Sequence, residues 1–269
     1  MSLPGRDVAL VDHVRTCQRT GLELIRAHAQ TAWRVQKSIH GALNPLTREP
    51  DSDRAGWGRW DFVGGRTVYA AHRRDGAFIE TLQTFHHTPE ASPRLSDLFD
   101  DEADGATLLE EVTREWDRQF GGFTPGLMPA GWRDDRTLYE LQLPDTGWFI
   151  DVQQATTLAA LGRITGRALT LTEITGNDRA LTTDIASLVR RVTLDDDSSP
   201  IGFQYYSRWG VDHLCYALWL DNEQPQDRPG GLRSDTLLDR GLQVRHEHAI
   251  NLNDPDLRTA ADIHNLRLV

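Results

Sequence analysis

The chain has 269 residues and a formal net charge of −11 at pH 7, with 39% hydrophobic and 26% charged residues. These proportions are typical of a folded globular protein and exclude a collagen, a coiled coil and a wholly disordered chain. An excess of acidic side chains repels phosphate backbones and anionic lipid surfaces, and no window of the sequence is strongly basic. We therefore expect neither direct nucleic-acid binding nor membrane binding.

The sequence also lacks the features of a membrane or secreted protein. No stretch approaches the roughly 18 consecutive apolar residues of a membrane-spanning helix, and the start MSLPGRD has no signal-peptide core. Cys17 and Cys215 are far apart, and neither has the Cys-x-x-Cys spacing of a redox or zinc site. We expect a cytoplasmic protein in which both cysteines are buried as small hydrophobic side chains.

The first part of the chain changes from a helical pattern to a strand-like one. Apolar residues recur at roughly helical intervals over residues 7–30 and predict one or two helices there. Residues 32–36 are typical of a short strand, and residues 41–58, rich in Gly, Pro, Asp and Arg, are typical of a long loop. A second strand is predicted over residues 67–71 from its residue types.

A helix is predicted directly after this second strand. Asp75 is the expected N-cap, and Phe78, Leu82 and Phe85 form an apolar stripe at helical spacing. Glu80 lies on another face of the same helix, where its neighbours three and four positions away are small. The sequence therefore predicts free space beside the Glu80 carboxylate.

The rest of the chain mixes short strands with scattered helices. A helix is predicted to begin at Thr107 and to end at Gly121-Gly122. Further strands are predicted over residues 138–143, 148–152, 201–206, 214–220 and 242–250, and further helices over residues 155–161 and 184–192. We expect the strands at 201–206 and 214–220 to pair. This mixture favours an α+β fold over a doubly wound parallel sheet.

Several common kinds of active site are missing from the sequence. It contains no dinucleotide-binding or phosphate-binding glycine loop, no His-Glu-x-x-His zinc motif and no Gly-x-Ser-x-Gly elbow. The pairs His86-His87 and His246-x-His248 lack a convincing third metal ligand, so we interpret them as solvated histidines and expect no metal site.

A different set of residues could act together. It consists of Arg34 on a strand, Gly58-Arg59-Trp60 in a loop, Tyr69 on a strand, Glu80 on the next helix and Ser207-Arg208 after a late strand. Each residue alone is ordinary for its context. Together they are compatible with one ligand, because an anionic substrate with a reacting sugar needs arginines, a carboxylate, an aromatic face and a hydroxyl.

Four motifs in the same order resemble the RES family, which is named after an arginine, a glutamate and a serine. They are Trp33-Arg34-Val35, Gly58-Arg59-Trp60-Asp61, the segment from Thr67 to Ala71 with Ala77 to Thr81, and the segment from Ile201 to Arg208. The resemblance covers roughly residues 32–221. It implies a compact fold similar to ADP-ribosyltransferases, with short, mostly antiparallel strands and surrounding helices. Family members are typically toxins that degrade NAD, some by phosphorolysis to ADP-ribose 1″-phosphate and nicotinamide.

The residues can be matched to the chemistry of NAD cleavage. Breaking the nicotinamide–ribose bond passes through an oxocarbenium-like state, which a carboxylate such as Glu80 would stabilise. Arg34, Arg59 and Arg208 are candidates for the pyrophosphate of NAD or for an incoming inorganic phosphate. The Tyr69 ring can stack on nicotinamide or its ribose, and the Ser207 hydroxyl can orient a substrate group. Ser207 is not expected to be a nucleophile, because no base is evident beside it.

The predicted site and its alternatives are therefore specific. We expect Glu80, Tyr69, Arg34 and Ser207 to be catalytic, and Arg34, Arg59, Tyr69, Ser207 and Arg208 to bind NAD or phosphate. NAD would be a substrate, inorganic phosphate a possible co-substrate, and no other cofactor is expected. An ADP-ribosyltransferase that modifies a protein or nucleic acid is the first alternative, and a catalytically silent nucleotide-binding module is the second.

The resemblance also guides the expected organisation and partners. Residues 1–31 are predicted as an N-terminal helical extension, residues 32–221 as the catalytic domain with a partly helical insertion at 86–137, and residues 222–269 as a loop and strand packed on the same domain. If the toxin interpretation holds, the family implies an antitoxin of the Xre helix-turn-helix type; a homo-oligomer is also possible. Surplus acid is expected away from the pocket, in runs such as 100–104 and 195–197.

Overall fold

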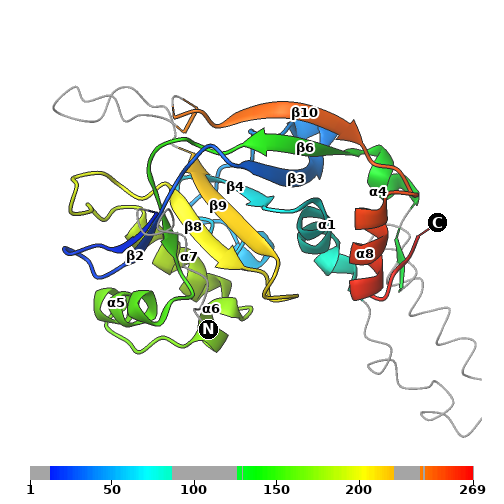
Figure 1. The fold of residues 1–269 in the computed structure, drawn as a ribbon. Helices are drawn as coiled ribbons and strands as arrows, with labels where there is room; N and C mark the ends of the chain where they lie inside the picture. Colours follow the sequence, from blue (N-terminus) through cyan, green and yellow to red (C-terminus); the bar gives the residue numbers. More distant parts are fainter. Residues whose placement is uncertain (1–12, 87–125, 129, 221–236, 239, 269) are drawn as a thin grey trace, which may run out of the picture.

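The computed structural model describes residues 13–86, 126–128, 130–220, 237–238 and 240–268 (Figure 1). Its strands are β1 Val14–Thr16, β2 Glu23–Arg26, β3 Thr31–Lys37, β4 Arg66–Ala71, β5 Leu127–Met128, β6 Arg136–Gln142, β7 Trp148–Asp151, β8 Gly202–Tyr206, β9 Leu214–Leu220, β10 Gln243–Ala249 and β11 Arg267–Leu268. Its α-helices are α1 Arg74–Leu82, α4 Ala130–Asp134, α5 Ala155–Thr165, α6 Leu171–Thr175, α7 Arg179–Val189 and α8 Pro255–Ile263.

The described strands form one large sheet and one small one. The large sheet has the order β1-β2-β7-β8-β9-β4-β3-β6-β10, and β5 pairs with β11 in a separate parallel pair. Within the large sheet only β7 and β8 run parallel; the other described neighbours are antiparallel. The fold is thus a mixed α+β arrangement built on a mostly antiparallel sheet, as the mixture of strand and helix patterns predicts.

Both faces of the central strands are buried, which explains their long apolar runs. In β9, Cys215, Ala217 and Trp219 belong to one core cluster, whereas Tyr216 and Leu218 belong to a second cluster on the opposite face. The α-helices contribute their buried side chains to the first cluster. The described helices therefore cover one face of the sheet, with α5, α6 and α7 near β7 and β8, and α1 and α8 near β3 (Figure 1).

The sheet opens between β3 and β4. Strand β3 pairs along its whole length with β6, and β4 pairs along its whole length with β9. Between β3 and β4, however, the register contains only the pair Trp33 with Ala71. Across this gap Arg34 Nη1 donates a hydrogen bond of 2.9 Å to the backbone carbonyl of Tyr69. A side chain thus occupies the space where a continuous backbone ladder would run.

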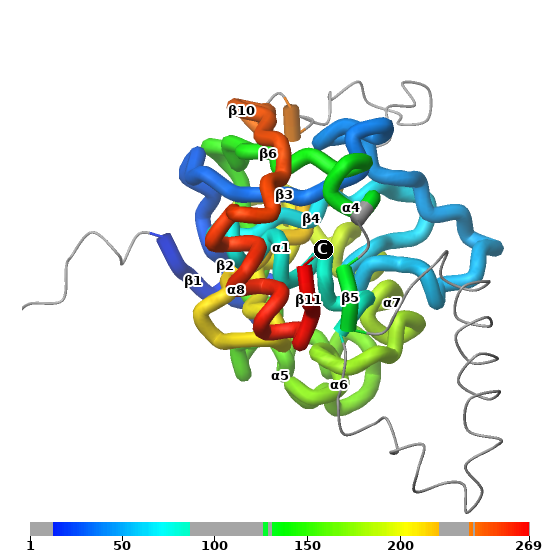
Figure 2. Tube along the Cα trace, turned by 90° about the vertical axis from the view of Figure 1, so that its right-hand side faces the viewer, coloured from blue at the N-terminus to red at the C-terminus, as the bar shows by residue number. Residues whose placement is uncertain are grey.

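The C-terminal segment packs against the helix that carries Glu80. Helices α1 and α8 lie side by side in two views, and they contact each other directly (Figures 1 and 2). Arg74 at the start of α1 bonds the Asp254 carboxylate at 2.6 Å, and Asp254 is the N-cap of α8. At the other end of α8, the ring Nε2 of His264 lies 2.8 Å from the carbonyl oxygen of Ile79. Contacts at both ends of α8 therefore hold α1 in place.

The strand predictions agree with the structure, and the predicted pairing of β8 with β9 is confirmed. Cys17 and Cys215 are free and buried, as expected. The predicted helix from Thr107 lies outside the described residues, as does most of the predicted loop at 222–241.

The prediction of helices over residues 7–30 is wrong for the part that the structure describes. Strands β1 and β2 form a hairpin instead, and β2 pairs with β7. Gly21 sits at φ 77° in the turn, a conformation that breaks a helix and favours glycine. Leu22 and Leu24 are both fully buried with a spacing of two, which is the period of a strand.

Two helix starts also differ from the prediction. Arg73, not Asp75, is the N-cap of α1; Asp75 lies in the first turn, where its carboxylate binds the Arg73 guanidinium at 2.6 and 3.0 Å. Helix α7 begins at Arg179 rather than at residue 184, because the Asp178 side chain caps the backbone N–H of Leu181.

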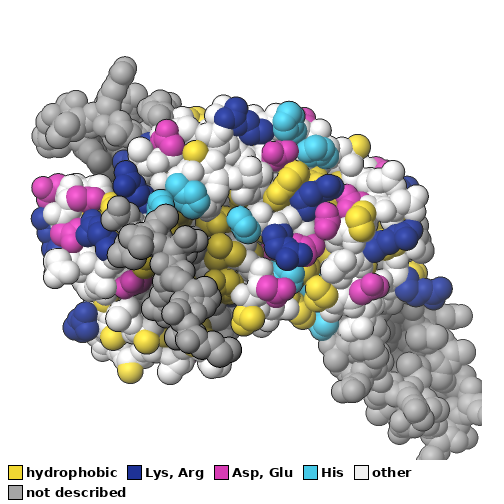
Figure 3. Space-filling model, viewed as in Figure 1, with side chains coloured by type: hydrophobic (Ala, Val, Ile, Leu, Met, Phe, Trp, Pro, Cys, Tyr) yellow, Lys and Arg dark blue, Asp and Glu magenta, His cyan; other side chains and the backbone are white. Residues whose placement is uncertain are grey.

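None of the helices in the described part of the chain combines the length and apolar character that crossing a membrane requires. On the face shown in Figure 3, side chains of both charge signs are interspersed.

Gly202 of β8 has no room for a side chain, and this gives a stability test. A Cβ at this position would lie 2.0 Å from the carbonyl oxygen of Ala217 in β9. We expect Gly202→Ala to push the two strands apart and to lower the free energy of unfolding by about 1–3 kcal/mol, measured by chemical denaturation. In Gly131→Ala the new Cβ meets nothing within 4 Å, so this exposed helical position serves as the control. Equal losses in both variants would contradict the close approach.

Candidate active site

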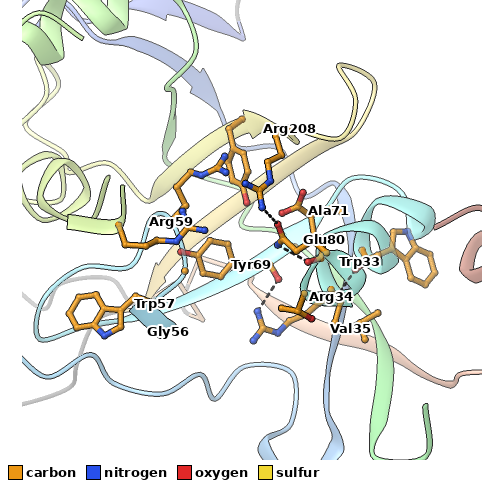
Figure 4. A pocket seen from close by; sticks show the side chains of 18 of the residues that line it. Trp33, Arg34, Val35, Gly56, Trp57, Arg59, Tyr69, Ala71, Glu80 and Arg208 are labelled. Atoms are coloured by element: carbon orange, nitrogen blue, oxygen red, sulfur yellow. Dashed lines mark hydrogen bonds between the residues drawn. The ribbon is translucent and has the colours of Figure 1, made fainter. Parts of the chain in front are cut away.

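A cavity of about 510 Å³ opens at the gap between β3 and β4. Side chains from these two strands, from α1 and from the loop before β4 line it (Figure 4). Arg179, Tyr205 and Arg208 also line the cavity. Among the described residues that line it, Glu80 is the one carboxylate, and Arg34 and Arg59 add to the arginines there. The cavity has the size of a typical small-molecule site and a strong excess of positive charge.

Glu80 is oriented by Ser207. The Ser207 hydroxyl donates to Glu80 Oε1 at 2.5 Å, and its oxygen accepts from the backbone N–H of Trp209 at 3.1 Å. Ser207 is 5% exposed, so its geometry is fixed by the turn between β8 and β9. Glu80 Oε2 has no hydrogen bond within the described ranges and remains available for a ligand. The small neighbours Ala77 and Thr84 line the cavity beside it, as the sequence predicts.

The loop that carries Arg59 is organised by a buried carboxylate. Asp61 is 2% exposed and accepts three hydrogen bonds, from Arg48 Nε at 2.5 Å, from the Gly58 N–H at 2.8 Å and from the Tyr69 hydroxyl at 2.9 Å. Because Arg48 takes the ion pair with Asp61, Arg59 is left without a carboxylate partner in the described part of the chain.

Tyr69 lines the cavity, and its hydroxyl is held by hydrogen bonds to the loop before β4. The hydroxyl donates to Asp61 and accepts from the Trp60 N–H at 2.8 Å. Burial, reinforced by the Asp61 charge, raises the pKa of Tyr69 well above its ordinary value, so the phenol stays protonated. A Cβ at Gly58 would lie 2.5 Å from the Tyr69 hydroxyl oxygen, so only glycine lets the loop pass this close. The ring is a rigid, partly buried wall of the cavity suited to stacking.

Arg34 is almost fully buried between β3 and β4. It is 7% exposed, and burial lowers its pKa to about 10, which still leaves it charged at neutral pH. Its Nη1 bonds the Tyr69 carbonyl, and its Nε is buried without a hydrogen bond in the part of the chain described. Arg34 thus both joins β3 to β4 and places a positive charge at the base of the cavity, below Tyr69 (Figure 4).

Arg208 is exposed and lies over the cavity beside Glu80. Its Nη1 donates to the Asn177 side-chain oxygen at 2.8 Å, and its Nη2 donates to the Gln83 side-chain oxygen at 3.2 Å. Both acceptors are neutral, so they orient the guanidinium without cancelling its charge. Burial and the charge of Arg59 lower the pKa of Arg208, and Glu80 partly opposes that change.

Arg179 was not among the residues that the sequence singled out. It is the first residue of α7, and its side chain lines the cavity with Nη1 3.4 Å from the carbonyl oxygen of Gly176. Burial, followed by the positive charge of Arg59, lowers its pKa, and Arg59 lines the same cavity. The Asp178 cap marks the start of this helix in the sequence, but the packing of α7 is what brings Arg179 to the cavity.

Tyr205 of β8 is a second residue that sequence reasoning missed. It is 5% exposed and lines the cavity. Burial and the nearby Cys215 and Glu80 raise its pKa well above the ordinary value. The alternation of β8 could have found it, because Tyr205 falls on the same face as the core residue Phe203.

A buried histidine supports the turn that carries Ser207. The His264 ring packs on Trp209 with centroids 4.5 Å apart, and its Nε2 contacts the Ile79 carbonyl. Because a carbonyl only accepts, Nε2 carries the proton, and Nδ1 has no hydrogen-bond partner in the described segments. Burial lowers the pKa of His264, and the neighbouring His86 and Arg208 lower it further.

The candidate histidine pairs do not form a metal site in the described residues. No group of three His, Cys, Asp or Glu side chains with metal-binding geometry occurs there. His246 and His248 lie with ring centroids 6.2 Å apart, and His248 Nε2 is 3.7 Å from Glu140 Oε2. His87 lies outside the described residues.

No protein-family model matches the chain, and no curated protein matches it. The resemblance to the RES family therefore rests on the four sequence motifs. The structure brings Arg34 and Glu80 of these motifs to one cavity, together with Arg59, Tyr69 and Arg208. Ser207 does not line the cavity itself but binds the Glu80 carboxylate.

His264 predicts a specific dependence of stability on pH. A histidine whose pKa is lowered by folding binds its proton more readily in the unfolded chain, so the free energy of unfolding falls as the pH drops below the ordinary value of 6.5. His264→Gln keeps an N–H donor for the Ile79 carbonyl but does not titrate. We expect the variant to lose less stability than the wild type between pH 7.5 and pH 5.5, measured by urea denaturation. A difference between the two proteins that stays constant over this range would contradict the role of His264.

Proposed function

We propose that the protein cleaves the bond between nicotinamide and ribose in NAD, transferring the ADP-ribosyl group to phosphate or water. The observation that carries this proposal is one oriented carboxylate, Glu80, in a cavity where the other charged side chains among the described lining residues are arginines. Nicotinamide leaves a cationic pyridinium as a neutral molecule, so the reaction needs a carboxylate to stabilise the developing oxocarbenium but no strong general acid.

The surrounding residues have matching tasks in this reaction. Glu80 Oε2 would face the developing positive charge on the ribose, while Ser207 holds Oε1 and fixes the plane of the carboxylate. The Tyr69 ring would stack against nicotinamide or its ribose. The cavity arginines that have no carboxylate partner among the described residues would bind the anionic part of the substrate. An oxygen of phosphate or water forms the new bond to the anomeric carbon of the ribose as the bond to nicotinamide breaks. Nicotinamide leaves as a neutral molecule, and an attacking water releases one proton to the solvent.

Incubation with NAD tests the proposal directly. The folded protein should release nicotinamide from NAD labelled in its ADP-ribose part, and the products identified with and without phosphate separate phosphorolysis from hydrolysis. We expect Glu80→Gln to lower kcat on the order of a hundredfold or more, because the carboxylate charge is lost. Glu247→Gln, an exposed change on β10, is the control for the same loss of charge.

The alternatives give different results in the same assay. Label attached to a protein or nucleic acid would favour an ADP-ribosyltransferase, and tight NAD binding without turnover would favour a silent binding module. If folded protein releases no nicotinamide in either condition, the proposal is wrong.

Ser207 should act by positioning Glu80 rather than by attacking the substrate. We expect Ser207→Ala to lower kcat about tenfold to hundredfold with little change in KM, since one hydrogen bond to a charged group is lost. Ser207→Thr keeps the hydroxyl and should recover most of kcat. Full activity in Ser207→Ala would refute this role, and trapping of an adduct on Ser207 would show a nucleophile instead.

A further inference from the structure

Three arginines that line the cavity have no carboxylate partner among the described residues, although the chain has a large surplus of acid. Arg59, Arg179 and Arg208 come from the loop before β4, from α7 and from the turn after β8. In the part of the chain that the structure describes, none of them lies within ion-pair distance of an Asp or Glu. The sequence has 40 Asp and Glu against 29 Lys and Arg, so acidic side chains are plentiful enough to pair with these arginines if the fold favoured such ion pairs.

Arginines elsewhere in the structure do find acidic partners. Arg48 pairs with Asp61 at 2.5 Å, Arg54 with Asp184 at 2.6 Å and Arg74 with Asp254 at 2.6 Å. The three cavity arginines differ in this respect. They are also close enough that the Arg59 charge lowers the pKa of both Arg179 and Arg208. A cluster of like charges is unfavourable by itself, and an anion that binds among them removes this repulsion.

Neutral oxygens hold this group in place. Arg208 is oriented by the side-chain oxygens of Asn177 and Gln83, and Arg179 Nη1 lies 3.4 Å from the Gly176 carbonyl oxygen. Arg59 is carried by the loop that Asp61 fixes through Gly58 and Tyr69. The guanidinium groups of Arg179 and Arg208 are therefore positioned before a ligand arrives, with no acidic partner in the described residues, and the loop backbone that carries Arg59 is fixed. Fixed donors of this kind bind phosphate oxygens with little ordering cost.

We propose that Arg179 completes, with Arg59 and Arg208, a binding site for the diphosphate bridge of a dinucleotide substrate. This proposal rests on the proposed function and assigns the anionic part of the substrate to a residue outside the four sequence motifs. Three guanidinium groups from three separate elements suit two linked phosphates, and the cavity of about 510 Å³ is much larger than one phosphate ion. Arg34, bonded to the Tyr69 carbonyl at the base of the cavity, does not belong to this group.

Binding of ADP-ribose to the full-length protein tests the proposal without requiring turnover. We expect Arg179→Gln to raise the Kd for ADP-ribose on the order of tenfold or more, measured by isothermal titration calorimetry. The matched control is Arg191→Gln, which makes the same charge change at an exposed position beyond the C-terminal end of α7. Arg208→Gln is a second test at an exposed residue, and circular dichroism checks that each variant is folded.

The outcomes separate this site from the proposed reaction. A higher Kd in Arg179→Gln and Arg208→Gln, but not in Arg191→Gln, supports the site even if the protein leaves NAD intact. If NAD is cleaved, Arg179→Gln should raise KM for NAD more than it lowers kcat. Unchanged ADP-ribose affinity in both cavity variants, or no binding by the wild type at millimolar ADP-ribose, overturns the proposal. A selective change in KM for inorganic phosphate with unchanged ADP-ribose affinity also overturns it, in favour of a phosphate site.

Discussion

The buried carboxylate of Asp61 is the interaction on which the cavity depends. It binds Arg48, the Gly58 N–H and the Tyr69 hydroxyl, and so joins the loop to the central strand β4. Removing the partner of a buried ion pair costs about 3–5 kcal/mol, so Asp61 depends on Arg48 for its compensating charge. Because Arg48 supplies the compensating charge, Asp61 leaves Arg59 without a carboxylate partner in the part of the chain that the structure describes. This ion pair therefore gives Arg48 a structural role, while the Arg59 guanidinium has no carboxylate partner among the described residues.

The distribution of ion pairs shows where part of the surplus acid is used. A net charge of −11 disfavours extended polyanions, but it says nothing about a local cavity. The acidic run at 195–197 is not a free surface either: Asp195 binds Arg15 at 2.6 Å and Asp197 binds Arg19 at 2.9 Å. These pairs fasten the β1–β2 hairpin to the rest of the chain. The acidic run at 100–104 lies outside the described residues.

Sequence patterns predicted the strands and the cavity's central residues because both depend on local information. Alternation in β4 and β9 and the apolar stripe of α1 follow from periodicity alone. The hairpin at residues 13–26 was mistaken for a helix because Val14, Cys17 and Ile25 also fit helical spacing, and pairing with β7 decides between the two. Arg179 could not be found by spacing, since its place at the cavity depends on how α7 packs. The pairing of Asp61 with Arg48 rather than Arg59 likewise depends on the folded loop.

The orientation of one carboxylate depends on segments that are far apart in the chain. Ser207, which holds Glu80 Oε1, is 127 residues from Glu80 along the chain. His264, which binds the carbonyl of Ile79 just before Glu80, is 185 residues from Ile79. His264 also packs on Trp209, whose N–H bonds the Ser207 oxygen. The glutamate and the serine are therefore braced by the same C-terminal histidine. It follows that the motif-bearing residues 32–221 do not by themselves contain the full support of the site, and that helix α8 is part of the structure that fixes Glu80.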